Sequence, residues 1–339
     1  MTSRELVYET LEFRNTSDRI PRHLWSLPWS TSRYPEVYAH LAETMPDDIV
    51  SAPNPLKTPL PEIGDPYAAG TYVDPFGSAF ENVQPGVIGE VKHPQILDDD
   101  WNDADRIRLP EEYFTLDVDA VNAFCRGTDR FVNMGACPRP FERLQFLRGS
   151  ENLYMDLADP PPKFFAFLER LHDFNCRLIT LWASKTDVDG VTFMDDWGAQ
   201  KSLLIRPQLW AEVFKPLYRD YIDIAHKYGK KAFMHSDGNT LDIYPHLIEL
   251  GLDAFNSQIF CIGVEKLRQF AGKITFWGEL DRQWILPQGS TEDVRSAVRS
   301  VYDTLWRDGG CIAQCEFGPG AKPENVVECF RAWNAVREN

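Results

Sequence analysis

The sequence predicts an α/β protein, a single (β/α)8 TIM barrel with an irregular, proline-rich N-terminal region. The first observation is that the second half of the chain alternates amphipathic helices with five short apolar strands. Strands joined in this way pair in parallel, because each crossover needs a helix. The second is that no GxGxxG or GxxxxGK motif follows any strand, which disfavours an open nucleotide-binding sheet. The third is length, since 339 residues fit one barrel of about 250 residues with insertions.

Helical spacing of apolar residues and the stop signals between them define the elements of this half. Gly229 and Gly251 each follow a helical pattern, and Ser290 with Asp293 has the spacing of a capping box. The predicted helices span residues 161–186, 206–230, 241–251, 264–272, 290–310 and 322–339, and the predicted strands 189–198, 231–238, 253–258, 273–281 and 311–317.

The first 130 residues are less regular. Strands are expected at residues 21–25 and 130–136, and prolines crowd residues 53–66. We expect this proline-rich stretch to be a long loop over one face of the barrel, where such loops carry substrate contacts. One domain is expected to span residues 1–339, with residues 1–17 as an N-terminal extension.

Composition limits the partners of the chain. Apolar residues make up 43% of the sequence and aromatic residues 13%, enough for a sizeable core. A formal charge of -16 argues against nucleic acid or an anionic membrane as partner. The polar start, the lack of an apolar stretch of about 18 residues and seven cysteines without a CxxC pair predict a cytoplasmic protein with reduced thiols.

Polar residues close each of the five strands. The carboxyl ends of the strands form the active face of a (β/α)8 barrel, so we expect these side chains to make a ring of metal-binding and acid–base groups. The ring comprises Asp195 and Asp196, then His235, Ser236 and Asp237, then Asn256, Ser257 and Gln258, then Glu279, Leu280 and Asp281, and finally Gln314, Cys315 and Glu316.

A metal site is the first chemistry that this ring suggests. Strand alternation puts His235 and Asp237 on one side of their strand, so both could reach one ion. With Cys315 from a non-adjacent strand they give nitrogen, carboxylate and sulfur donors for zinc, and an open fourth position is typical of a catalytic zinc site. The alternative for His235 is a hydrogen-bonded residue that closes a strand.

Acid–base catalysis is the second chemistry that the ring of polar strand ends suggests. Strand alternation lets only one of Asp195 and Asp196 face inward, and the other is expected to cap a helix or form a salt bridge. The inward residue, or Glu279, could move a proton. The alternative for Glu279 is an ion pair with an arginine.

Aromatic side chains near the expected mouth could line an apolar substrate pocket. Trp25, Trp29 and Trp197 are the candidates, and Gln258 is a candidate polar substrate contact at a strand end. The alternative for the tryptophans is the core.

Three stretches resemble the uroporphyrinogen decarboxylase superfamily, which implies a (β/α)8 barrel. They are "FMDDWGAQKSLLIRPQLWAEVFKPLYRDYIDIAHKYGKKAFMHSDGNTLDIYPHLIELGLDAFNSQ", "FWGELDRQWILPQGSTEDVRSAV" and "GPGAKPENVVECFRAWN". The resemblance runs from about residue 18 to the C-terminus. The superfamily contains both porphyrinogen decarboxylases and zinc-dependent corrinoid methyltransferases, so the fold alone does not define the reaction.

The decarboxylase branch is similar to this chain in part. Its "RQAGRY" motif, whose arginines hold substrate carboxylates, is replaced by "PRHLWSLPWSTSRYPE", although Arg22 and Arg33 are nearby. A metal-independent decarboxylase of a uroporphyrinogen-like or other carboxylated substrate is therefore the alternative function, and it would need arginines at the mouth.

The methyltransferase branch, such as the methylcobalamin:coenzyme M enzymes, resembles this chain more closely than the decarboxylase branch does. Its zinc ligands are a His-x-Cys motif and a later Cys placed ten residues before an Asn. Here His235 matches the histidine, Asp237 replaces the first cysteine, and Cys315 lies ten residues before Asn325.

This resemblance implies a zinc-dependent methyltransferase that moves a methyl group between a small substrate and cobalamin on a partner corrinoid protein. Homodimers are common in the superfamily, so a homodimer is also expected. A non-catalytic binding barrel is a third interpretation, which the ring of polar strand ends disfavours.

Overall fold

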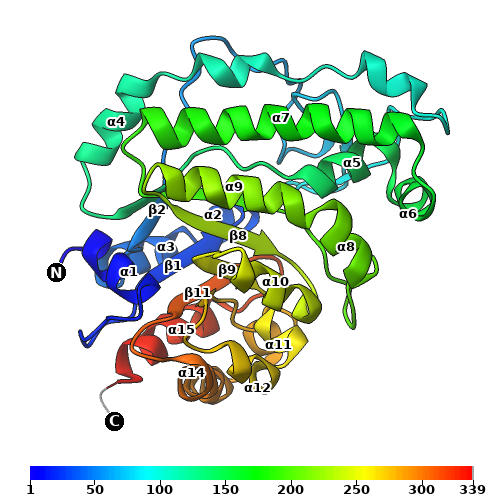
Figure 1. The fold of residues 1–339 in the computed structure, drawn as a ribbon. Helices are drawn as coiled ribbons and strands as arrows, with labels where there is room; N and C mark the ends of the chain where they lie inside the picture. Colours follow the sequence, from blue (N-terminus) through cyan, green and yellow to red (C-terminus); the bar gives the residue numbers. More distant parts are fainter. Residues whose placement is uncertain (338–339) are drawn as a thin grey trace.

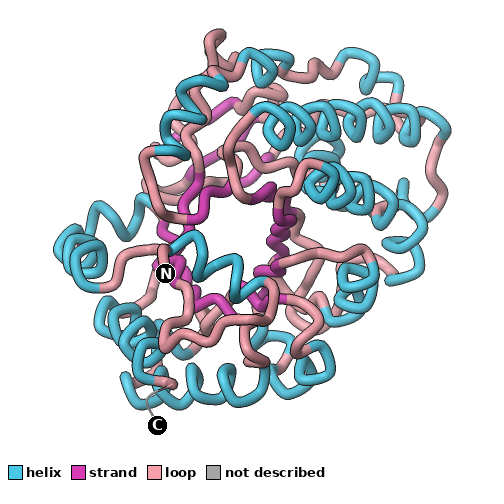
Figure 2. The backbone as a smooth tube through the Cα atoms, turned by 60° about the vertical axis from the view of Figure 1, so that its left-hand side comes forward, coloured by secondary structure: helices cyan, strands magenta, loops and turns pink. Residues whose placement is uncertain are grey.

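Eight parallel strands form a nearly closed barrel in the computed structural model of this protein, in which residues 1–337 are described. Around the barrel the order is β1 (Arg22–Ser26), β11 (Cys311–Phe317), β10 (Thr275–Trp277), β9 (Ala254–Ser257), β8 (Lys231–Ser236), β7 (Gly190–Met194), β6 (Phe131–Asn133) and β2 (Ile49–Ser51). The end strands β1 and β2 contact each other, and helices surround the ring (Figure 2). The predicted (β/α)8 fold is confirmed.

Helices cover the outside of the second half of the barrel, as predicted (Figure 1). They are α7 (Pro162–Lys185), α8 (Pro207–Val213), α9 (Lys215–Lys227), α10 (Tyr244–Glu249), α11 (Ile259–Ile262), α12 (Val264–Leu267), α13 (Ile285–Gln288), α14 (Thr291–Leu305) and α15 (Pro323–Ala335). The single helix predicted over 206–230 is divided at Phe214, because Pro216 has no N–H for the helical ladder. The capping box of Ser290 and Asp293 is present. No helix within residues 1–337 is long and apolar enough to cross a membrane.

Helix α1 (Ser3–Leu11) closes the amino-terminal end of the barrel and crosses the ring of strands (Figure 2). Its Val7 and Leu11 pack against side chains that point into the barrel, among them Phe131, Phe233 and Trp277. Because this apolar cluster fills the lower half of the barrel, the open space lies at the carboxyl ends of the strands.

The N-terminal half adds an insertion to the barrel. Residues 53–66 form a loop without helix or strand, apart from isolated bridges, as expected. A small antiparallel sheet follows, which the sequence did not reveal: β3 (Gly70–Val73), β4 (Ala79–Asn82) and β5 (Glu90–Val91). The remaining helices are α2 (Pro28–Arg33), α3 (Pro35–Thr44), α4 (Val118–Arg126), α5 (Pro140–Arg148) and α6 (Ser150–Ala158).

Candidate metal and acid–base site

His235 points into the barrel from β8, one step above the apolar cluster that contains Phe233. Its Nδ1 lies 2.6 Å from Asn256 Oδ1 of the neighbouring β9. The amide nitrogen of Asn256 donates to the backbone oxygen of Trp277, so the amide oxygen is the atom that faces the histidine. Nδ1 of His235 therefore carries the hydrogen and donates, which leaves Nε2 facing the mouth.

Two carboxylates face this Nε2 atom. It lies 3.6 Å from Asp196 Oδ1 and 3.6 Å from Asp237 Oδ1. Burial alone would lower the pKa of His235, but Asp196 and Asp237 outweigh it and raise the pKa to about 9. One ligand atom from each of the three residues lies within 4.8 Å of the others, close enough to share a metal ion. The sequence thus correctly placed His235 and Asp237 on one side of their strand.

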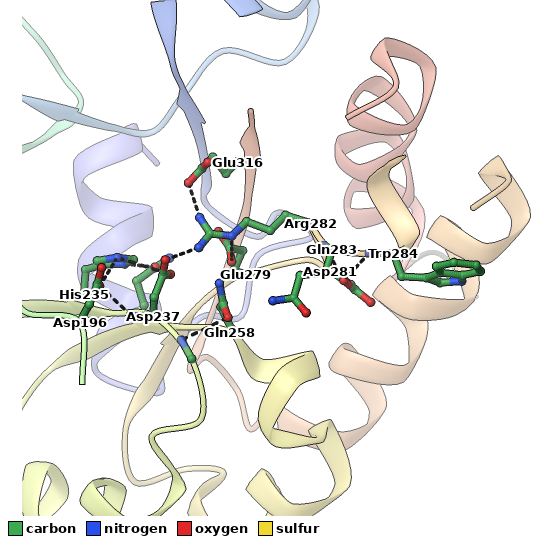
Figure 3. A network of polar contacts seen from close by, with 12 residues as sticks. Asp196, His235, Asp237, Gln258, Glu279, Asp281, Arg282, Gln283, Trp284 and Glu316 are labelled. Carbon is green, nitrogen blue, oxygen red and sulfur yellow. Dashed lines mark hydrogen bonds and ion pairs between the residues drawn. The ribbon is translucent and has the colours of Figure 1, made fainter. Parts of the chain in front are cut away.

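Arg282 connects this group to two further carboxylates (Figure 3). The guanidinium pairs with Asp237, lies 2.7 Å from Glu316 Oε2 and lies 3.3 Å from Glu279 Oε2. Burial raises the pKa of Glu279 to about 8; Arg282 opposes the shift, and Asp237 and Glu316 add to it. Glu279 is therefore largely protonated at neutral pH, and it has the arginine partner that the sequence offered as its alternative role.

A cavity of about 370 Å³, called the barrel cavity below, opens beside His235. The ring centroids of Trp25 and His235 are 5.1 Å apart, so Trp25 lines this cavity as predicted from the sequence. His23 accepts hydrogen bonds from the indole nitrogens of Trp277 at 3.1 Å and Trp25 at 3.3 Å. Burial lowers the pKa of His23 to about 3, so it is a neutral acceptor that orients both indole rings.

Asp195 has a structural role as the cap of helix α5. Its carboxylate accepts from the backbone N–H groups of Phe141 at 3.0 Å and Glu142 at 2.7 Å, and so caps the start of α5. The Tyr218 hydroxyl donates to it at 2.5 Å. Of the two neighbouring aspartates, Asp196 faces the site and Asp195 is the helix cap, so Asp195 is not placed for catalysis.

The structure does not bring Cys315 to His235 and Asp237. Cys315 is in register with Leu24 of β1, and its thiol faces Cys329 of α15 in the core outside the barrel. Alternation along β11 turns the next residue, Glu316, towards Arg282 inside the barrel. The expected set of His235, Asp237 and Cys315 is thus not assembled.

Two of the tryptophans also lie elsewhere. Trp197 is fully buried, stacks on Phe141 with ring centroids 3.9 Å apart, and donates to the Tyr218 hydroxyl at 2.7 Å. Trp29 lies on α2 with the Arg33 guanidinium 4.5 Å from its ring centroid, and it is not among the residues that line the barrel cavity. Trp197 belongs to the core, the alternative that the sequence allowed.

Gln258 lies next to the acid–base residues. Its Oε1 accepts from the backbone N–H of Gly238 at 3.1 Å, and it lines a pocket of about 190 Å³ together with Glu279 and Arg282. A substrate that extends from the barrel cavity towards this pocket would meet its amide, in keeping with the predicted contact.

Sequence reasoning missed Arg282 and His23 as site residues, and it named Asn256 and Glu316 only as members of the ring of polar strand ends, without a role. A signal for Glu316 existed, because alternation in "CIAQCEF" puts Cys311 and Cys315 on one face and Glu316 on the other. No local pattern marks Arg282, whose reach depends on the loop after β10.

Fold and site together define a (β/α)8 barrel with a cluster of histidine, carboxylate and arginine side chains at the carboxyl ends of its strands. The family model for uroporphyrinogen decarboxylase (URO-D) matches residues 79–336, and the chain belongs to this family. The resemblance seen in the sequence is confirmed at that level.

Comparison with solved structures supports the fold. A methyltransferase from Methanosarcina mazei has a TM-score of 0.64 and 14% identity, covering 100% of this chain and 98% of that chain. A glycosylated endo-beta-1,4-xylanase from Gloeophyllum trabeum has a TM-score of 0.45 and 10% identity, covering 97% of this chain and 100% of that chain. No curated protein sequence matches the chain. At 14% identity, the similarity to the methyltransferase concerns the barrel and not the reaction.

Proposed function

We propose that this protein is a methyltransferase that binds zinc at Asp196, His235 and Asp237 and moves a methyl group between a small substrate and a corrinoid carrier. The observation that carries the proposal is the arrangement of His235. Its Nδ1 is held by Asn256 at 2.6 Å, and its Nε2 faces two carboxylates at the barrel cavity. Metal-binding histidines have such a carbonyl or carboxylate partner on the second ring nitrogen.

The residues present fit a divalent ion. Oδ1 of Asp237 is buried and has no hydrogen-bond partner among residues 1–337, which is a cost that a cation would relieve. Asp196 and Asp237 face His235, and Asp237 and Glu316 pair with Arg282, so three carboxylates share the single fixed positive charge of this guanidinium. A divalent ion and a neutral His235 would balance these charges. Imidazole nitrogen and carboxylate oxygen are both zinc ligands, although this set is harder than one with two sulfurs.

The chemistry that zinc supplies when bound is Lewis-acid activation of a substrate oxygen or sulfur. The chain itself supplies the proton. Glu279 has a pKa raised to about 8 and lies 3.3 Å from Arg282, so it holds a proton at neutral pH at a fixed place. A protonated carboxyl at this position can donate to a leaving oxygen, and its ionised form can take the proton back.

The barrel cavity is too small to enclose the corrinoid carrier. A volume of about 370 Å³ suits a small substrate but does not enclose a corrinoid. The corrinoid would therefore approach the mouth from outside, presented by a partner protein, while Trp25 and Trp277 exclude water from the substrate.

The test is a methyl-transfer assay with the full-length protein loaded with zinc. Methylcobalamin and a panel of small thiols, and separately cob(I)alamin and a panel of methyl ethers, would be followed by the cobalamin absorbance change. We expect transfer in at least one direction, and a loss of about 100-fold or more in His235→Ala. The exposed His93 provides the control variant His93→Ala, which should keep the wild-type rate. Transfer by neither route in zinc-loaded protein would contradict the proposal.

The raised pKa of His235 favours a second candidate, a metal-independent decarboxylase of a carboxylated substrate. Without a metal, the imidazolium held between Asp196 and Asp237 could protonate the carbanion left by the loss of CO2. Release of CO2 from a uroporphyrinogen-like substrate by chelator-treated protein, unaffected by added zinc, would favour this candidate over methyl transfer.

A further inference from the structure

A second cavity of about 400 Å³, called the side chamber below, lies next to the barrel cavity. The small β3–β5 sheet, α5 and α7 contribute its walls. Gly135, Ala136 and Cys137, which follow β6, line both cavities. A ligand in the side chamber would therefore be separated from the barrel cavity only by this short segment.

Aromatic rings make up much of the wall of the side chamber. They are those of Tyr72, Phe76, Phe80, Tyr113, Phe146 and Phe174. The pairs Phe80–Phe146 and Phe76–Phe174 meet edge to face, with ring centroids 5.1 Å and 5.9 Å apart. A planar ring that enters such a cavity gains both burial and edge-to-face contacts.

Two arginines line the side chamber, and they differ in their partners. Arg143 forms an ion pair with Asp74 and stacks on Phe76, with the guanidinium 3.8 Å from the ring centroid. The Arg139 side chain makes no hydrogen bond within residues 1–337, and its nearest carboxylate oxygen, in Glu142, is 3.6 Å away. Arg139 thus has all its donors free, whereas Arg143 already has a carboxylate partner.

Unpartnered acceptors lie beside Arg139. Oε2 of Glu142 and Oδ1 of Asn54 are buried and have no hydrogen-bond partner among residues 1–337. Burial raises the pKa of Glu142, which favours its neutral form and weakens its attraction for Arg139. A ligand carboxylate cannot donate to the Asn54 oxygen, but the neutral carboxyl of Glu142 can donate a hydrogen bond to such a carboxylate.

We propose that the side chamber binds an aromatic ring that carries a carboxylate, with the carboxylate on Arg139 and the ring among the aromatic side chains. A planar guanidinium with free donors binds a carboxylate through two parallel hydrogen bonds. This ligand would lie apart from the small substrate in the barrel cavity, so the inference goes beyond the proposed function. The binding itself depends only on the side chamber.

Isothermal titration of the full-length protein with benzoate tests this inference. Benzamide has the same shape without the charge, and acetate has the charge without the ring. We expect benzoate to bind at least about tenfold more tightly than either, because a charged hydrogen-bonded pair and a buried ring are each lost. Equal binding of benzoate and benzamide, or no binding of benzoate, would overturn the inference.

Variants then locate the site. Arg139→Gln should weaken benzoate binding by about tenfold or more and leave benzamide binding unchanged. The matched control is Arg126→Gln, which removes an exposed guanidinium that pairs with Asp187 on the surface. If Arg139→Gln does not fold, the benzoate and benzamide comparison on the wild type still decides. Wild-type affinity in Arg139→Gln contradicts the assignment.

The inference and the proposed function can fail separately. Benzoate binding by a protein that shows no methyl transfer even when loaded with zinc would support the side chamber and count against the methyltransferase. Methyl transfer by zinc-loaded protein that does not bind benzoate would support the methyltransferase and contradict the side-chamber inference.

Discussion

If zinc binds as proposed, replacing Asn256 with alanine should weaken its binding, although Asn256 does not face the proposed ligands Asp196 and Asp237. The side chain is fully buried and makes two hydrogen bonds, one from His235 Nδ1 at 2.6 Å and one to the Trp277 backbone oxygen. Its loss frees the imidazole to rotate and removes the acceptor that keeps the hydrogen on Nδ1. The lone pair of Nε2 is then no longer held towards Asp196 and Asp237.

The expected magnitude follows from this single contact. Loss of a partner on the second nitrogen of a metal-binding histidine reduces metal affinity about 10- to 100-fold. Since tenfold corresponds to about 1.4 kcal/mol, the predicted cost is about 1.4 to 2.7 kcal/mol in zinc binding.

Competition with a chromophoric zinc chelator measures this difference directly. The control is Ser257→Ala on the same strand, because Ser257 is buried and bonds to the Tyr244 hydroxyl at 2.6 Å on the other face. It should lose about 1 kcal/mol of unfolding free energy and keep the zinc affinity. Wild-type zinc affinity in a folded Asn256→Ala would refute the role assigned to the asparagine and to His235 Nε2.

Further predictions concern three other residues. Cys315→Ser should bind as much zinc as the wild type, because the thiol faces Cys329 outside the barrel, and metal analysis checks this. It should lose about 1–3 kcal/mol of unfolding free energy in urea, because a hydroxyl is then buried without a good partner. Leu11→Ala should lower the free energy of unfolding in urea by about 2–5 kcal/mol, since Leu11 closes the bottom of the barrel; a change below about 1 kcal/mol would argue against this role. Burial raises the pKa of the Cys137 thiol to about 12, so at pH 8 it should react with iodoacetamide far more slowly than free cysteine, and rapid labelling in the folded protein would contradict this.

Much of the barrel could be predicted from the sequence, because each strand and helix of the second half carries its own period and stop signal. The same local rule placed His235 and Asp237 together, since alternation along one strand needs no knowledge of its neighbours. The same alternation puts Cys311 and Cys315 of "CIAQCEF" on one face of the strand, and both are buried in the same core cluster. The expected zinc set took Cys315 from the polar end of its strand, and the resemblance supported it, although alternation turns Glu316 and not Cys315 into the barrel.

Other features depend on contacts between distant segments. Asp195 and Asp196 are neighbours in sequence, and only the position of α5 decides that the first caps a helix. Arg282 reaches three carboxylates from a loop whose path no periodicity records. The side chamber requires the β3–β5 sheet, and the proline-rich sequence before it gave no sign of that sheet.

The most direct measurement is the metal content of the protein purified without added metal, compared between wild type and His235→Ala. We expect about one zinc ion per chain in the wild type and almost none in the variant, with both proteins folded. Wild-type protein without metal that cannot be loaded with zinc, or a His235→Ala variant that keeps it, would contradict the metal site at the mouth of this barrel.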